Sequence, residues 1–281
     1  MRPINKKIDD LLKQNNNYTN GNFGLYFNKF VEINDNGKDQ FKPDKDYHYT
    51  NLKNKYDTIK NNNHLLNLLK QKHSDQKKYL EMYEKISFKI YEQSFKLKSP
   101  LIVGIGETNP GEVGMVFDRT LGIPYIPASS IKGVTRFAHL LDLLKTGVPD
   151  DKIKTDKDGK KYFDRNEDWT KVVELFGGDK KNNKGEKESC MGQVIFLDAY
   201  PDKAPELNID IMNPHYVKYY EDKKTPPADY CEPRPIKFLT VAKGETFIFR
   251  FIAPNDDLFG YSKKALEKAL FEEGIGAKTA V

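Results

Sequence analysis

The order of periodic segments after residue 92 limits most strongly what this chain can fold into. The stretch "SFKLKSPLIVGIG" (94–106) alternates and then becomes continuously apolar, which is typical of a strand that enters a buried sheet. A helix is predicted next, within "GIPYIPASSIKGVTRF" (122–137) and the residues after it. At 100° per residue, six apolar residues of this helix fall on one arc: Ile131, Val134, Phe137, Ala138, Leu141 and Leu144.

Strand patterns return in "GQVIFLDAY" (192–200), in "IDIMNPHYVKYY" (209–220) and in "IKFLTVAKGETFIFRFIAP" (236–254). The last is interrupted at Lys243 and Gly244, as a hairpin would be. An amphipathic helix, "SKKALEKALFEEG", ends at Gly274, and "IGAKTAV" begins another strand. The order of strand, helix, strands, helix and strand predicts an α+β protein with a ferredoxin-like (RRM-like, split βαβ) core that carries insertions.

Two segments lie outside this pattern. Residues 1–90 are predicted to be an N-terminal extension of one short strand, in "NFGLYFNKFVEI", and helices in "LLNLLKQ" and "QKKYLEMYEKI". The main domain then spans residues 91–281. A charged insertion at about 145–190 carries one short helix around Trp169–Phe176, and we expect most of it to be exposed.

Composition limits the classes of function. The chain has 281 residues and a net charge of +5, which is mildly basic and would suit a polyanionic partner. Cys190 and Cys231 stand alone, and His48, His64 and His73 are scattered, so neither a zinc site, nor a disulfide framework, nor a cofactor is indicated. No segment approaches a membrane span, and we expect a soluble, cytoplasmic protein.

The predicted helix near residue 130 has a basic face. Pro127 with Ser129 or Ser130 would supply its entry and N-cap. Lys132, Arg136 and His139 fall on one arc, beside a helix N-terminus whose dipole favours anions. The alternative is a solvated basic face on an ordinary helix.

A glycine-rich loop, "GIGAKT" (274–279), lacks the Gly-Lys-Ser/Thr order of a P-loop and leaves a helix rather than entering one. Gly274 and Gly276 nevertheless offer bare backbone that a phosphate can approach, with Lys278 adjacent. The alternative is a helix C-cap followed by a tight turn.

Aromatic and polar residues cluster in "IMNPHYVKYY". Asn213, His215, Tyr216 and Tyr219 suit stacking and hydrogen bonding to unpaired bases, although tyrosines on a strand also pack in half-buried sheets. Arg234 follows in a proline-stiffened loop, "KKTPPADYCEPRPI", that would suit an interface.

An enzymatic alternative remains open. Metal-dependent phosphodiester cleavage would need carboxylates, but the spacing of the candidates fits no ligand motif; they are Asp118, Asp198 and Asp210. His215 with Lys218 or Tyr216 could act as general acid and base in metal-independent cleavage of RNA.

Several of these segments, in their order along the chain, resemble one family. They are "LIVGIGETNPGEVGMVFDRTLGIPYIPASSIKGVTRF", "LFGG" before "GQVIFLDAYP", "DIMNPHYVKYY", "PPADYCEPRPIKFLTV" and "GIGAKTAV". Together they are similar to the RAMP superfamily and, within it, to the sixth-subunit family of the Cmr (type III-B CRISPR) effector complexes. The resemblance covers roughly residues 90–281.

The resemblance implies a ferredoxin-like core in a non-catalytic RNA-binding subunit. Such a subunit caps the filament of repeated backbone subunits near the 3′ part of the guide RNA and supports binding of target RNA in antiviral defence. Its partners would be guide (CRISPR) RNA, target RNA and the other Cmr subunits. Two alternatives stay open: a metal-independent endoribonuclease of the guide-processing type, and a purely structural capping subunit whose basic face is incidental.

The resemblance also implies site residues. Guide phosphates would run along the helix and the glycine loop, at Ser129, Ser130, Lys132, Arg136, Gly274, Gly276 and Lys278. Asn213, His215, Tyr216 and Tyr219 would line or brace that surface. Because these contacts go to the RNA backbone, base pairing by the guide would read the sequence.

Overall fold

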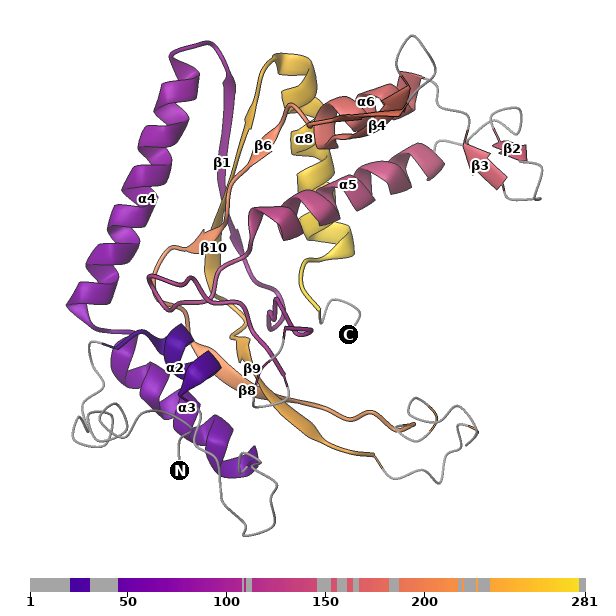
Figure 1. The fold of residues 1–281 in the computed structure, drawn as a ribbon. Coiled ribbons are helices and arrows are strands. Elements are labelled where there is room, and N and C mark those ends of the chain that lie inside the picture. Colours follow the sequence, from indigo (N-terminus) through magenta and orange to yellow (C-terminus); the bar gives the residue numbers. More distant parts are fainter. Residues whose placement is uncertain are drawn as a thin grey trace. The chain divides into compact units, whose positions relative to one another are not determined.

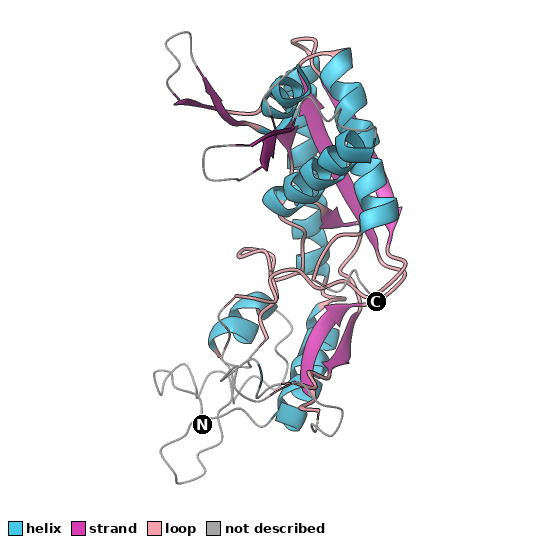
Figure 2. Cartoon of the chain, turned by 90° about the vertical axis from the view of Figure 1, so that its right-hand side faces the viewer, coloured by secondary structure: helices cyan, strands magenta, loops and turns pink. Residues whose placement is uncertain are grey.

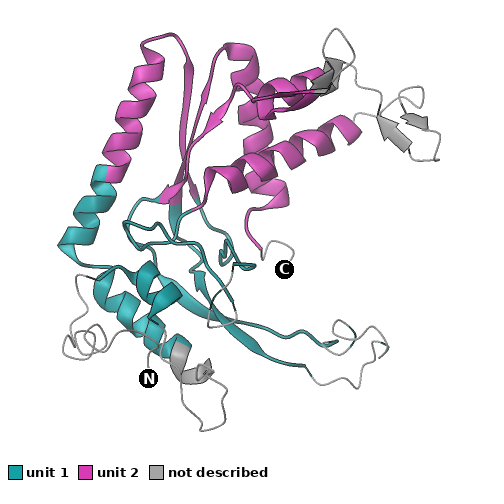
Figure 3. Cartoon of the chain, in the orientation of Figure 1, with its two compact units in different colours: residues 1–71, 96–125, 201–246 teal, residues 72–95, 126–200, 247–281 magenta. Residues whose placement is uncertain are grey.

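The structure is a computed structural model that describes most of the chain. Its described residues are 21–30, 45–107, 109, 113–145, 153–155, 161–163, 167–181, 187–216, 219, 226 and 233–277. The chain forms two compact units (Figure 3). Unit 1 combines residues 1–71, 96–125 and 201–246, and unit 2 combines residues 72–95, 126–200 and 247–281.

The central sheet of unit 2 has the strand order β1-β10-β6, and β7 (Tyr200–Pro201) also pairs with β10. β1 spans Lys89–Lys96, β10 spans Thr246–Ala253 and β6 spans Ile195–Phe196 (Figure 1). β6 runs antiparallel to β10, with Phe196 opposite Phe251. The chain therefore has mixed α and β structure, as the sequence predicted.

Helices cover the face of this sheet to which Phe251 points. They are α5 (Ala128–Lys145), α6 (Glu167–Phe176) and α8 (Asp256–Lys268), followed by the π-helical turn η2 (Ala269–Glu273). The ring centroid of Phe251 lies 5.6 Å from that of Phe259 on α8. α8 begins where Asn255 accepts a hydrogen bond from the Leu258 amide, and Asp256 and Asp257 complement the helix dipole in its first turn.

The other face of the sheet is covered by α4 (Asn63–Glu84), one of the cyan helices in Figure 2. Leu80 of α4 packs with Leu197 and with Ile252 of β10. Ile252 points away from the side of Phe251 because side chains alternate along a strand. The sheet of unit 2 is therefore buried on both faces at these positions.

Unit 1 is built on the hairpin of β8 (Leu207–Met212) and β9 (Ile236–Val241). The two strands are antiparallel, in a register that runs from Leu207 opposite Val241 to Met212 opposite Ile236. α2 (Phe23–Lys29) and α3 (Lys45–Ile59) belong to the same unit. Phe23 and Phe27 of α2 pack with Phe117, with ring centroids 5.3 Å and 5.1 Å from it. Tyr56 of α3 packs with Phe23, with ring centroids 5.0 Å apart.

The described residues also form two small hairpins. β2 (Ile153–Thr155) pairs with β3 (Lys161–Phe163), and β4 (Gly178–Lys181) pairs with β5 (Lys187–Cys190). Gly177, between α6 and β4, and Gly178, the first residue of β4, have φ angles of 78° and 152°, which few residues other than glycine adopt.

Three predictions for the first hundred residues are wrong. The expected strand in "NFGLYFNKFVEI" is the helix α2, because Asn22 caps it and Phe23, Gly24, Tyr26 and Phe27 are buried at helical spacing. The two expected helices are one helix, α4, whereas α3 was not predicted. β1 ends at Lys96, before the apolar run 101–106, in which Leu101 forms only an isolated bridge with Val241.

Later in the chain the results are mixed. The helix at Trp169–Phe176 is confirmed, but it is not exposed, because Val172 and Leu175 are 0% exposed. The expected hairpin at Lys243 and Gly244 is wrong: β9 pairs with β8, and β10 pairs with β1 and β6. Gly244 has a φ of 95° at the turn where the chain passes between the two sheets. The predicted final strand falls mostly on 278–281, outside the described residues.

Candidate nucleic-acid interface

The basic helix α5 begins at Ala128, earlier than the two candidate N-cap serines. The Ala128 amide donates a 2.7 Å hydrogen bond to Oδ1 of Asp198, so the first free amide of the helix is satisfied by a carboxylate. The amides of Ser130 and Ile131 donate to the carbonyl of Pro127. The predicted serine N-cap is therefore wrong, because both serines already lie in the first turn.

The buried side of α5 is rotated from the predicted arc. It consists of Ile131, Thr135, Ala138 and His139. Phe137 and Leu144 are instead 52% and 49% exposed. His139 does not join the basic face, since its ring lies 5.9 Å from Phe176 and 6.0 Å from Tyr261, measured between centroids.

The opposite side of α5 carries four residues at i, i+3, i+4 and i+7 spacing, which we call the α5 outer face: Ser129, Lys132, Gly133 and Arg136. Ser129 and Gly133 are exposed, whereas Lys132 and Arg136 are half-buried. A Cβ placed on Gly133 would meet no atom within 4 Å. Packing within the chain does not require glycine here, and the sequence analysis missed this position.

The glycine loop follows the end of η2. The Gly274 amide donates to the carbonyl of Ala269 at 2.7 Å, which confirms Gly274 as the C-cap. Gly274 and Gly276 have φ angles of 78° and 104°, so both positions favour glycine. The predicted phosphate-binding Lys278 lies outside the described residues.

The β8–β9 hairpin of unit 1 leads into the aromatic cluster. Asn213 and His215 are exposed, Tyr216 is half-buried and Tyr219 is 40% exposed. The ring centroids of His215 and Tyr216 are 6.3 Å apart. The Arg234 amide donates to the carbonyl of Pro214, which closes the hairpin beside these residues.

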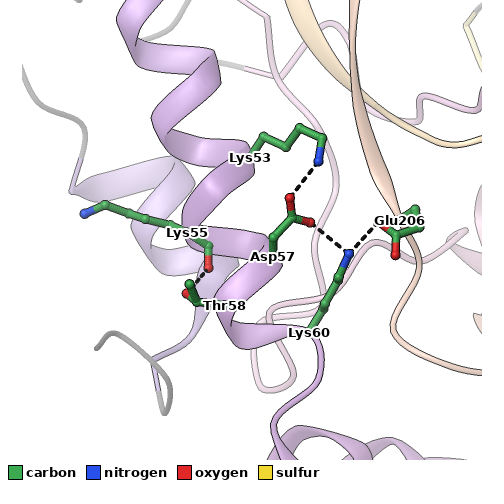
Figure 4. A network of polar contacts seen from close by, with 6 residues as sticks. All are labelled: Lys53, Lys55, Asp57, Thr58, Lys60 and Glu206. Carbon is green, nitrogen blue, oxygen red and sulfur yellow. Dashed lines mark hydrogen bonds and ion pairs between the residues drawn. The ribbon is translucent and has the colours of Figure 1, made fainter. Parts of the chain in front are cut away.

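An ion-pair network holds this hairpin to α3 (Figure 4). Asp57 of α3 contacts Nζ of Lys53 at 2.6 Å and Nζ of Lys60 at 2.9 Å. Lys60 reaches Glu206, next to the start of β8, at 2.5 Å. Burial raises the pKa of the Asp57 carboxyl, but the hydrogen bonds from Lys53 and Lys60 outweigh it and leave the pKa below its ordinary value.

The three candidate catalytic aspartates have local structural partners. Asp118 accepts the amides of Thr120 and Leu121, both at 2.8 Å, and Asp198 caps α5. Asp210 accepts the amide of Ile211 at 2.8 Å. Among the described residues, no group of three or more His, Cys, Asp or Glu residues could hold a metal ion.

Cys190 is a free thiol, whereas Cys231 lies outside the described residues.

Comparison with known proteins decides the family. A family model described as the RAMP superfamily matches residues 94–281, which include α5, β10 and α8. The chain belongs to the RAMP superfamily. Its RAMP region holds every candidate site residue named above, from Ser129 to Lys278.

Two relatives are similar over most of the chain. "CRISPR system Cmr subunit Cmr6" of Pyrococcus furiosus is 31% identical over 249 residues, covering 73% of this chain and 70% of the relative. "CRISPR system CMR subunit Cmr6" of Saccharolobus solfataricus is 27% identical over 207 residues. That match covers 72% of this chain but only 58% of the relative.

A solved structure shares the fold. A chain in the cryo-EM structure of the type III-B Cmr-beta bound to cognate target RNA superposes with a TM-score of 0.54 at 21% identity. The superposition covers 98% of this chain and 82% of the other.

In the part of the chain that the structure describes, no helix is long and apolar enough to span a membrane.

Proposed function

We propose that this RAMP protein is a non-catalytic RNA-binding subunit of a type III-B CRISPR (Cmr) effector complex. The observation that carries the proposal is the α5 outer face, where Lys132 and Arg136 flank an open Gly133 on a helix whose other side is buried. Such a face offers two positive charges and bare backbone to one track of phosphates. The named Cmr6 relatives support the assignment to this complex.

We propose a ferredoxin-like core for unit 2. The order β1-β10-β6 corresponds to first, third and second strands, with α5 following the first strand and α8 following the third. Because α4 covers one face of the sheet, we assign the RNA to the α5 outer face and the glycine loop and not to an open sheet surface.

We further propose that the subunit caps the filament of repeated backbone subunits, near the 3′ part of the guide RNA, and supports binding of target RNA. Its partners would be the guide, the target and the other Cmr subunits. Asn213, His215, Tyr216 and Tyr219 would contact or brace the RNA from the β8–β9 hairpin, and Gly274, Gly276 and Lys278 would follow its phosphates. The main domain would span residues 91–281.

The test is the salt dependence of guide-RNA affinity in the assembled complex. We expect Lys132→Ala combined with Arg136→Ala to weaken binding and to reduce the slope of log K against log salt by about one unit per lost phosphate contact. The matched control is Lys78→Ala with Lys85→Ala, since both lysines are exposed, Lys78 on α4 and Lys85 directly after its last residue. An unchanged slope in the α5 variant, or an equal loss in the control, would contradict the proposed interface.

A further inference from the structure

A fully buried arginine lies on the α4 side of the central sheet. The side chain of Arg250 on β10 is 0% exposed, and its Nε atom donates to Glu92 of β1 at 2.7 Å. Its Nη1 atom donates to Oε1 of Gln76 on α4 at 2.7 Å and lies 3.2 Å from Nδ1 of His73. Its Nη2 atom is buried and has no hydrogen-bond partner among the described residues. Burying an arginine is costly unless its donors are satisfied, so the contacts with Gln76 and His73 offset part of this cost and tie α4 to one location on the sheet.

Gln76 uses both ends of its amide. Its Oε1 atom accepts from Arg250, and its Nε2 atom donates to the backbone carbonyl of Asp198 at 2.9 Å. An arginine can only donate and a carbonyl can only accept, so the two partners together determine the orientation of the Gln76 amide. Gln76 therefore connects the buried arginine to the segment between β6 and β7.

Asp198 completes the connection to the basic helix. Its backbone carbonyl accepts from Gln76, while its Oδ1 atom accepts the first amide of α5, that of Ala128. Ile126 and Ala199 exchange two 2.9 Å backbone hydrogen bonds directly beside this cap. A continuous set of bonds thus runs from Glu92 through Arg250, Gln76 and Asp198 to Ala128.

We propose that Gln76 and Asp198 are positioning residues for RNA binding, and that α4 sets the location of the α5 outer face through them. The part of the proposal that concerns RNA affinity rests on the proposed function. The part that concerns the position of α5, which amide hydrogen exchange measures, does not. The proposal assigns a role to α4, which lies before the residues that match the RAMP family model. This helix would cover one face of the sheet and determine where α5 begins. Because Asp198 already occupies the Ala128 amide, phosphate binding on α5 depends on Lys132 and Arg136 more than on the helix N-terminus.

The structural readout is amide hydrogen exchange in the first turn of α5, measured in the full chain within the assembled complex. We expect Gln76→Leu, which has similar size but no polar atoms, to speed exchange at residues 128–131, although these lie on a different element. The control Gln93→Leu changes an exposed glutamine on β1 and should leave this exchange unchanged. Unchanged exchange in Gln76→Leu would overturn the proposal.

A second pair of variants addresses the case in which Gln76→Leu perturbs folding. Asp198→Asn keeps an oxygen that can accept the Ala128 amide, whereas Asp198→Ala removes it. We expect Asp198→Ala to weaken guide-RNA binding by roughly three- to tenfold, as for loss of a helix cap, and Asp198→Asn to restore most of it. Equal loss in both variants would contradict a positioning role.

Coupling to Lys132 separates positioning from a loss of stability alone. If Asp198 positions Lys132, Asp198→Ala combined with Lys132→Ala should bind RNA about as weakly as Lys132→Ala alone. Additive losses would overturn the proposal. If Lys132→Ala has no effect on RNA binding, the proposed function fails at this face, and the hydrogen-exchange result alone then decides whether Gln76 positions α5.

Discussion

The ring of Tyr91 on β1 stacks on the ring of Phe251 on β10, with centroids 4.7 Å apart and planes 12° from parallel. Four residues after Tyr91 on β1, the ring of Phe95 packs against that of Phe249 on β10. Residue numbers therefore rise along β1 where they fall along β10, so the two strands are antiparallel. This register points Phe251 toward α8 and Arg250 toward α4. One strand thus supplies the apolar core on one side and the buried arginine on the other.

The helix in the charged insertion should be essential for stability. Leu175 on α6 is 0% exposed, so Leu175→Ala is expected to lower the free energy of unfolding by about 2–5 kcal/mol. Met191, which is 91% exposed, provides the control, and Met191→Ala should change stability by less than about 0.5 kcal/mol. Chemical denaturation measures both, and similar small effects would contradict the packing of α6 described here.

Gly133 should show opposite effects on stability and RNA affinity. Glycine inside a helix costs about 0.5–1 kcal/mol relative to alanine, and a Cβ here meets no atom of the described residues within 4 Å, so Gly133→Ala should stabilise the protein. If RNA backbone lies close to the α5 outer face, the same change should weaken guide binding.

Gly260 on α8 is the matched control for this prediction, since a Cβ there also meets no atom within 4 Å. Gly260→Ala should stabilise the protein by a similar amount and leave guide affinity unchanged. Denaturation and binding measured on the same samples test the prediction. Unchanged affinity in Gly133→Ala would argue against close approach of RNA at this point.

The network around Asp57 predicts a pH-dependent contribution to stability. The folded-state pKa of Asp57 lies below the ordinary value of 3.8, so its stabilisation is present above that value and is lost as pH falls through the folded pKa. Asp57→Asn should therefore lower stability by about 0.5–1 kcal/mol at neutral pH, and the difference should vanish in acid. Denaturation of both proteins between neutral and acidic pH measures this, with exposed Glu81→Gln as control. A difference that persists in strong acid would contradict the ion-pair explanation.

The endoribonuclease alternative has a direct assay. The proposed function is non-catalytic, so we expect the purified protein, with its exposed His215, not to cleave a repeat-derived RNA hairpin in EDTA. Cleavage by the wild-type protein that is lost in His215→Ala would instead establish the alternative. The variant His64→Ala, on α4, controls for effects of removing an exposed histidine.

Local patterns predicted the elements whose periodicity agrees with their packing. α5, α6 and α8 were found from helical spacing, and Gly274 was identified as a C-cap from its position after the last apolar turn. The prediction for the segment of α2 was wrong because its aromatic residues also fit strand alternation. The cap at Asn22, the burial at helical spacing and the packing against Phe117 favour the helix.

Features that depend on distant partners were not predictable from local sequence. Asp198 caps α5 from 70 residues away, and its only local signal is an aspartate after a strand. Gly244 indicated a turn, but the strands on either side of it do not pair with each other. β9 pairs with β8, and β10 pairs with β1 and β6, which lie elsewhere in the sequence. For the same reason, no pattern around Arg250 or Gln76 indicated that they meet.

Native purification of the tagged protein from its own host tests the central claim most directly, with mass spectrometry of its partners and sequencing of its RNA. The account predicts recovery of the other Cmr subunits together with short RNAs that share one repeat-derived 5′ tag. Recovery of the protein alone, free of RNA, would contradict it.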